Sequence, residues 1–193
     1  MRAILFLTLA ACSFQATASN PTAIDGGVVT GDARPPDGSS FTPCTGYVSL
    51  GTALEPSSYR VVTTPTRFKN AELACEADLA HLVIFDSNDE ATLVAAAATA
   101  APLASAWVGF SDLKNEGQWI DVAGRASLYM DTRWAPSEPS QGGNDNCASL
   151  IGTAKLNAAN CGSSDGAAGD TRGYVCECGD GVQGNEKTFL RPD

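Results

Sequence analysis

The stretch from residue 107 to residue 178 decides how this chain is expected to fold. It contains, in order, WVGFSD (107–112), NEGQW (115–119), WAPSEPS (134–140) and four cysteines, Cys147, Cys161, Cys176 and Cys178. Apolar runs at 107–110, 148–151 and 173–178 have the composition of strands. Residues 131–146 and 153–172 have the composition of loops. This half therefore predicts short strands that are separated by long loops.

The preceding segment has a helical pattern instead. Phe68, Ala71, Cys75 and Leu79 recur on one face of a helix for which Thr66 is a plausible N-cap. Lys69, Glu72 and Glu76 are displaced from this face. LVIF (82–85) indicates a buried strand, SNDE (87–90) is a capping box that begins a second helix, and Pro102 closes that helix. Short strand-like runs at 46–50 and 59–63 come first. Helices followed by strands and loops predict an α+β domain.

Together these motifs resemble the C-type lectin-like domain, whose pattern runs WIGL, EGxW, WxxxEPN, a cysteine, WND, a cysteine and a closing CE. RFKNAELAC (67–75) is similar to the family's helix motif WxxAxxxC, with Phe68 in the tryptophan position. AHLVIFDSNDE (80–90) is similar to GAHLVxIxSxxE. The resemblance covers about residues 41–179. It implies the C-type lectin-like fold, in which two helices flank short antiparallel strands beside a long-loop region.

Six cysteines lie outside the first eighteen residues, and an even number in an exported chain favours disulfides. Six cysteines allow 15 pairings, among which the sequence alone does not choose. The resemblance implies that Cys75 pairs with Cys176 and that Cys147 pairs with Cys161.

Cys44 and Cys178 then remain. Cys176 and Cys178 project to the same face of a strand, and the family's first strand runs antiparallel beside its last. We therefore predict a Cys44–Cys178 bond; the alternative is a free thiol or an intermolecular link. A Cys/His metal cluster is not indicated, because His81 is remote from the cysteines in sequence.

The N-terminus has the features of an export signal: Arg2, an apolar run at 3–11 and no acidic residue before Asp25. LAAC (9–12) resembles a bacterial lipobox, so we expect cleavage before Cys12, lipidation of that cysteine and a signal of residues 1–11. The alternative is an 18-residue signal (1–18) cleaved after Ala18, which releases a secreted protein. We then expect a flexible tether (19–40), the domain (41–179) and a C-terminal tail (180–193).

Composition restricts the partners. Twelve basic and twenty-two acidic residues give a net charge of −10, which opposes binding to nucleic acid and to anionic membrane surfaces. A membrane association is expected only through the lipid anchor. No nucleophile motif accompanies His81, which is interpreted as a packed residue, so no enzymatic activity is expected. A glycan or a cell-surface protein is the expected partner.

The resemblance also implies a calcium and sugar site in the long-loop region. Calcium-dependent members take ligands from EPN, with a cis proline, from a glutamate before the next cysteine, and from WND. Here Glu138 and Pro139 are present, Ser140 replaces the asparagine, and Asp145 lies where the glutamate is expected. The WND element is LNA (156–158), in which Asn157 remains.

Ala158 takes the place of the WND aspartate. Calcium requires roughly 6 to 8 oxygen ligands, so this loss predicts binding at millimolar concentration or weaker. One interpretation is a weakened calcium lectin site formed by Glu138, Asp145 and Asn157. The other is a calcium-independent protein-binding or structural domain in which the Glu138-Pro139 turn has only a structural role. EPS matches neither the EPN motif of mannose-type members nor the QPD motif of galactose-type members, so the sugar is not implied.

Overall fold

The computed structural model describes residues 44–51, 54, 56–126, 130, 132–140, 143–161 and 169–185. The predicted signal segment, the predicted lipidation site at Cys12 and the predicted tether lie outside these residues. Within them, no helix is long and apolar enough to cross a membrane.

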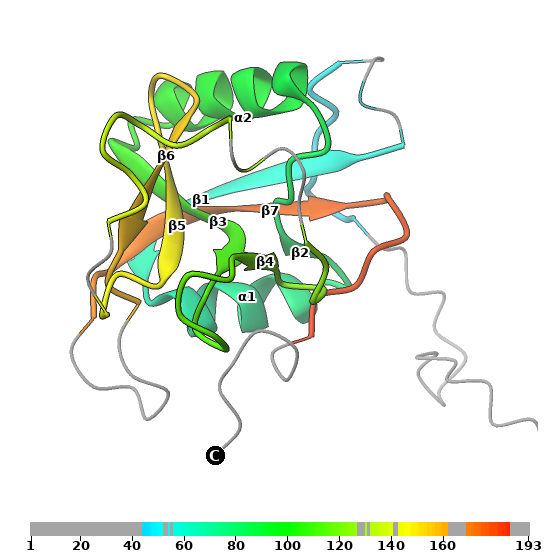
Figure 1. Cartoon of the computed structure of the whole chain (residues 1–193). Coiled ribbons are helices and arrows are strands. Elements are labelled where there is room, and N and C mark those ends of the chain that lie inside the picture. The colour runs from blue at the N-terminus through cyan, green and yellow to red at the C-terminus, as the bar shows by residue number, and fades with distance from the viewer. Residues whose placement is uncertain are drawn as a thin grey trace, which may run out of the picture. The chain divides into compact units, whose positions relative to one another are not determined.

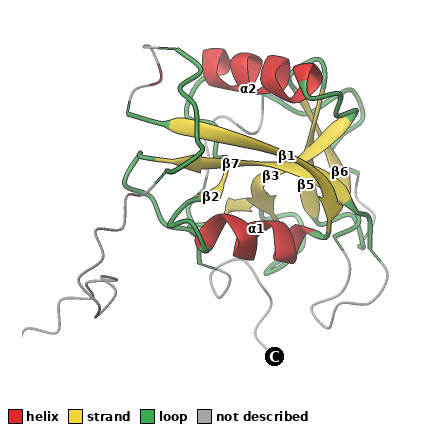
Figure 2. Ribbon diagram, turned by 180° about the vertical axis from the view of Figure 1, so that it is seen from behind, coloured by secondary structure: helices red, strands yellow, loops and turns green. Residues whose placement is uncertain are grey.

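Two helices cover opposite sides of one sheet, as Figures 1 and 2 show from opposite directions. In chain order, the elements are β1 (Ser58–Thr66), α1 (Phe68–Glu76), β2 (His81–Leu82), α2 (Asn88–Ala100), β3 (Ser105–Ser111), β4 (Ile120–Asp121), β5 (Cys147–Ile151), β6 (Lys155–Ala159) and β7 (Arg172–Cys178). The strand order is β1-β7-β3-β5-β6, with β2 beside β7 and β4 beside β3. The predicted α+β class, with two helices and short strands, is confirmed.

The sheet is mixed rather than wholly antiparallel. β1 pairs antiparallel with β7, which joins the first and last strands of the domain. β3, however, pairs parallel with β7, with Trp107 opposite Tyr174. This pairing corrects the expectation of antiparallel strands only. A parallel pair requires a long crossover connection, and the segment between β3 and β7 carries β4, β5 and β6.

The first helix differs from its prediction at both ends. Thr66 is the last residue of β1, and its carbonyl accepts a hydrogen bond from Trp107 Nε1 at 2.8 Å. Arg67 is the N-cap, and its side chain makes no capping hydrogen bond. Leu79 lies beyond the helix with φ +56°. Glu72, which the apolar spacing displaced from the buried face, is fully buried, because its carboxylate accepts from the Leu82 N–H at 2.7 Å.

The second helix begins as predicted, since Ser87 Oγ accepts from the Glu90 N–H at 3.1 Å. Residues 82–85 are all buried, but only Leu82 belongs to a strand. The run at 46–50 is also not a strand, because only Val48 forms an isolated bridge, with Tyr59. The segment 153–172, expected to be a loop, contains β6, which pairs with β5 along five residues.

The WVGF motif is at the centre of the core. Trp107 is fully buried and meets Phe68 edge to face at 5.7 Å between ring centroids. A Cβ on Gly109 would lie 2.4 Å from the Leu82 carbonyl oxygen, so this position requires glycine. The motif therefore brings β3 against the segment that begins with β2.

Three disulfides connect the domain, and their partners are the predicted ones: Cys44–Cys178, Cys75–Cys176 and Cys147–Cys161. Their Cα–Cα distances are 5.7, 5.5 and 5.4 Å. The first two join the N-terminal half to positions two residues apart at the end of β7. The third holds the beginning of β5 to the residue that follows Asn160, beside the end of β6.

Candidate functional site

The long-loop region, residues 132–140 and 143–161, places Glu138 at the edge of β6. The Glu138–Pro139 peptide is cis. Glu138 Oε2 accepts from the Ser140 N–H at 2.8 Å and from the Ala158 N–H at 3.0 Å. The glutamate is therefore fixed against the strand position where the family pattern has its WND aspartate.

Ser140 connects the two carboxylates of this region. Its hydroxyl donates to Asp145 Oδ2 at 3.0 Å, while its N–H donates to Glu138. All three residues are half-buried. The structure thus brings Glu138, Ser140 and Asp145 together in one hydrogen-bonded group, although Gln141 and Gly142 between them lie outside the described residues.

Two amide oxygens of the long-loop region have no partner in the described part of the chain. They are Asn157 Oδ1, on β6, and Asn146 Oδ1, next to Asp145, and both are buried. A buried carbonyl oxygen without a donor costs about 1–3 kcal/mol, which a cation or a water molecule offsets. The sequence analysis selected Asn157 as a ligand, and Asn146 was not among the ligands that it named. No hydrogen bond joins the Asn157 side chain to Glu138 or Asp145 within the described segments.

These side-chain oxygens are of the type that calcium prefers, but few of them carry a negative charge. Carboxylate and amide oxygens are the ligands that calcium prefers. Two carboxylates are present, however, and Glu138 Oε2 is already used by two backbone N–H groups. Position 158 contributes a methyl group and no oxygen side chain. Of the predicted ligands, the structure joins Glu138 and Asp145 through Ser140. That these two carboxylates and Asn157 would hold calcium, with Ser140 at the edge, stays a prediction.

A second polar group, which the sequence analysis missed, lies at the C-terminal end of β7. Ser57, Tyr59, Asp86, Glu90, Glu177 and Asp180 line an open cleft of about 280 Å³. Glu177 is buried; its Oε1 accepts from Ser57 Oγ at 2.7 Å and its Oε2 accepts from the Ile84 N–H at 3.2 Å. Tyr59 donates to Glu90 Oε1 at 2.7 Å.

His81 lies behind this cleft and is fully buried, as expected for a packed residue, but it is also ion-paired. Its Nε2 is 3.2 Å from Asp180 Oδ1. Burial lowers the pKa of His81, but the Asp180 hydrogen bond and the charge of Glu177 outweigh burial and raise it to about 9. Burial, reinforced by the charge of Glu90, raises the pKa of Glu177 to about 8. The closing CE motif was a signal for Glu177, but nothing in the sequence indicated Asp180.

Residues 180–185, assigned to a C-terminal tail, pack against the domain. Asp180 contacts His81, and a Cβ on Gly184 would overlap the Glu72 carboxylate. The Asn185 N–H donates to the Val122 carbonyl at 3.1 Å. These contacts bury the acid–histidine group under the segment that follows β7.

Comparison with known families places these motifs in a family. The lectin C-type domain matches residues 64–177. C-type lectin domain family 4 member M from Gorilla gorilla gorilla is 29% identical over 103 residues, which cover 53% of this chain and 27% of that protein. Perlucin from Haliotis laevigata is 33% identical over 96 residues, which cover 49% of this chain and 61% of that protein. The chain thus spans less than two thirds of the length of these relatives.

Solved structures support the same fold. The mouse scavenger receptor C-type lectin carbohydrate-recognition domain matches with a TM-score of 0.58 at 21% identity, over 70% of this chain and 95% of that one. The cow CD23 domain, solved in the presence of a GlcNAc2Man3 oligosaccharide, matches with a TM-score of 0.56 at 26% identity, over 67% and 92%. A calcium-independent type II antifreeze protein matches with a TM-score of 0.57 at 18% identity, over 70% and 92%.

Proposed function

Because the chain belongs to the C-type lectin domain family, whose members are ligand-binding modules and not enzymes, we propose that it binds carbohydrate through its long-loop region with weak calcium dependence. The observation that supports this most is the hydrogen-bonded group of Glu138, Ser140 and Asp145, together with Asn157 Oδ1, which is buried without a partner in the described part of the chain. The cow CD23 domain, solved with an oligosaccharide present, is a relative whose ligand class is consistent with this proposal.

The alternative is a calcium-independent protein-binding or structural domain. It is supported by Ala158 and by the internal hydrogen bonds of the loop, which hold Glu138 without any metal. A calcium-independent antifreeze protein shares the fold, which shows that this scaffold does not require the ion.

Calcium titration separates the two functions. A ligand that binds only the native state raises the melting temperature, and we expect this rise only at about millimolar calcium or above. The double variant Ser140→Asn/Ala158→Asp restores two oxygen ligands and should lower the calcium midpoint at least about tenfold. Binding to immobilised mannose-type and galactose-type oligosaccharides, with calcium or with EDTA, then identifies the sugar class.

Ala126→Asp is the matched control, because it adds one carboxylate at an exposed position outside residues 132–161. It should leave the calcium midpoint unchanged. A restored variant without any calcium response would show that the loop geometry excludes the ion and would favour the protein-binding alternative. Micromolar binding by the unchanged protein would instead show that other oxygens, such as Asn146 Oδ1, complete the site.

We also propose that the protein is exported and anchored by a lipid on Cys12. The support is the LAAC sequence together with the six other cysteines, all of which form disulfides in the domain. Expression in a bacterial host with a lipoprotein pathway should give a mature chain that begins at Cys12 and carries acyl groups, as measured by intact mass spectrometry. A chain that begins at Ser19 without an acyl group would indicate a secreted protein instead.

A further inference from the structure

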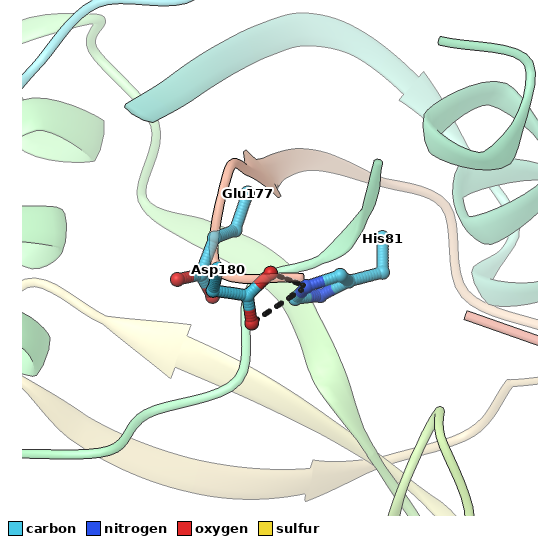
Figure 3. A group of neighbouring side chains, drawn as sticks. All are labelled: His81, Glu177 and Asp180. Carbon is cyan, nitrogen blue, oxygen red and sulfur yellow. Dashed lines mark hydrogen bonds and ion pairs between the residues drawn. The ribbon is translucent and has the colours of Figure 1, made fainter. Parts of the chain in front are cut away.

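His81, Glu177 and Asp180 come from β2, from β7 and from the turn after β7, and their side chains converge (Figure 3). One ligand atom from each lies within 4.8 Å of the others. His81 and Glu177 are buried, and only the Asp180 carboxylate is partly exposed, at 14%. Three potential metal ligands of two chemical types therefore meet at one point beneath the cleft.

The histidine is held with one particular nitrogen toward the carboxylates. His81 Nδ1 lies 2.8 Å from the Leu82 carbonyl oxygen, which can only accept, so Nδ1 carries the proton of that bond. Nε2 is then the nitrogen that faces Asp180, and Figure 3 shows it directed there. Histidines that bind metals are oriented by the same kind of bond from the other ring nitrogen to a carbonyl.

The surroundings carry an excess of acid. Asp86 and Glu90 line the cleft together with Glu177 and Asp180. The charge of Arg125 acts on Asp86 and Asp180, but its guanidinium is hydrogen-bonded to Asp121. A divalent cation at the convergence point would offset this charge, and the cleft gives it a path from solvent beside Asp180.

We propose that His81 Nε2, Asp180 and Glu177 form a binding site for a divalent transition metal of the zinc class, separate from the long-loop region. The metal takes the place of the proton on Nε2, which is released to solvent. An imidazole ligand favours zinc, copper, iron or nickel over calcium, which prefers oxygen alone. Ligand atoms in a tetrahedral zinc shell lie roughly 3.3 Å apart, given bonds of about 2.0 Å. The 3.2 Å from Nε2 to Asp180 Oδ1 already matches, whereas the distance between the Asp180 and Glu177 carboxylates has to adjust to the metal.

The position of Asp180 permits such an adjustment. It lies between Gly179 and Gly181, both with positive φ, in the turn that leaves β7. Glu177 and Ser57 line the cleft on the other side, where a water molecule or a small ligand can take the fourth position. A metal held there would bind β2, β7 and this turn to one another.

The chain has a single histidine, so the experiment has an unambiguous signal. Tag-free protein is titrated with ZnCl2 while the imidazole proton resonances are followed by NMR and the melting temperature is measured. We expect one equivalent of zinc to shift the His81 resonances and to raise the melting temperature. Calcium at the same concentration should leave the His81 resonances unchanged.

Asp180→Asn tests the ligand set, because the amide oxygen can still accept from the Val182 N–H as Asp180 Oδ1 does. It should weaken zinc binding at least about tenfold. The matched control is Asp170→Asn, which removes an exposed carboxylate paired with Arg172 and should bind zinc as the unchanged protein does.

Three outcomes would overturn the proposal. Zinc could bind without shifting the His81 resonances, which would place the ion elsewhere. Asp180→Asn could bind zinc as tightly as the unchanged protein, provided that its melting temperature in EDTA is unchanged, so that the variant is known to be folded. Millimolar zinc could have no effect on either signal, which would show that the cluster is a His81–Asp180 ion pair only.

Discussion

Removal of both Cys44–Cys178 and Cys75–Cys176 is expected to unfold the domain at 37 °C. The two bonds end two residues apart, at Cys176 and Cys178, and both constrain the same long segment of the unfolded chain. In the chain-entropy model, loops of this length together contribute about 8 kcal/mol. That is a large part of the total stability of about 5–15 kcal/mol that is typical of a domain.

Removal of either bond alone should cost much less. While one remains, the other closes only the loop of about 30 residues from Cys44 to Cys75, which is worth about 4 kcal/mol. Paired cysteine-to-alanine variants and denaturant unfolding measure these values. Removal of Cys147–Cys161, which closes 14 residues, should cost about 3 kcal/mol and is the matched comparison. Equal losses for the double and the single removals would show that the chain-entropy account is wrong here.

Glu72→Gln is expected to gain stability over the unchanged protein as the pH rises from 5 to 9. Glu72 is fully buried on α1, and its Oε1 has no hydrogen-bond partner among the described residues. Burial raises the pKa of Glu72 to about 8, although the Leu82 N–H and the charge of His81 oppose the rise. The folded state therefore prefers the protonated carboxyl.

The sign follows from the proton count. The folded-state pKa lies above the unfolded value, so the folded chain binds more protons between about pH 4.5 and 8, and stability falls as the pH rises through this window. Glutamine resembles the neutral form and does not titrate. The difference in unfolding free energy between variant and unchanged protein should thus change by several kcal/mol.

Urea unfolding of both proteins at pH 5 and at pH 9 measures this change. Glu116→Gln is the control, because it alters an exposed glutamate in the loop after β3 and should behave as the unchanged protein at both pH values. A difference between Glu72→Gln and the unchanged protein that is the same at both pH values would show that Glu72 is ionised in the folded state.

Several features of the domain follow from local sequence patterns. The Ser87–Glu90 capping box begins α2, and the WVGF run forms the buried strand β3, because caps and apolar runs act between residues that are close in sequence. The disulfide pairs came from the family resemblance and from the two-residue period of β7, and all three pairs are present in the structure. The cis Glu138–Pro139 bond agrees with the family pattern.

Other features depend on contacts between distant segments, which no local pattern contains. By helical spacing Glu72 belonged to the exposed face of α1, yet it is buried, because the Leu82 N–H and Gly184 meet it there. Thr66 is of a residue type that commonly caps helices, but its carbonyl accepts a hydrogen bond from Trp107 Nε1.

By itself, the sequence determined the two helices and the core motif around Trp107, because these depend on periodicity. The partners of the six cysteines followed from the sequence only together with the family resemblance, which rests on a recognisable order of motifs. Only the tertiary structure decided that Asp180 reaches His81, that Glu177 lies beside both, and that Ser140 joins Glu138 to Asp145. The ends of β2 and β7 are almost a hundred residues apart in the chain, and the antiparallel pairing of the two strands brings them together. The shifted pKa values of His81 and Glu177 and the proposed metal site therefore depend on that pairing.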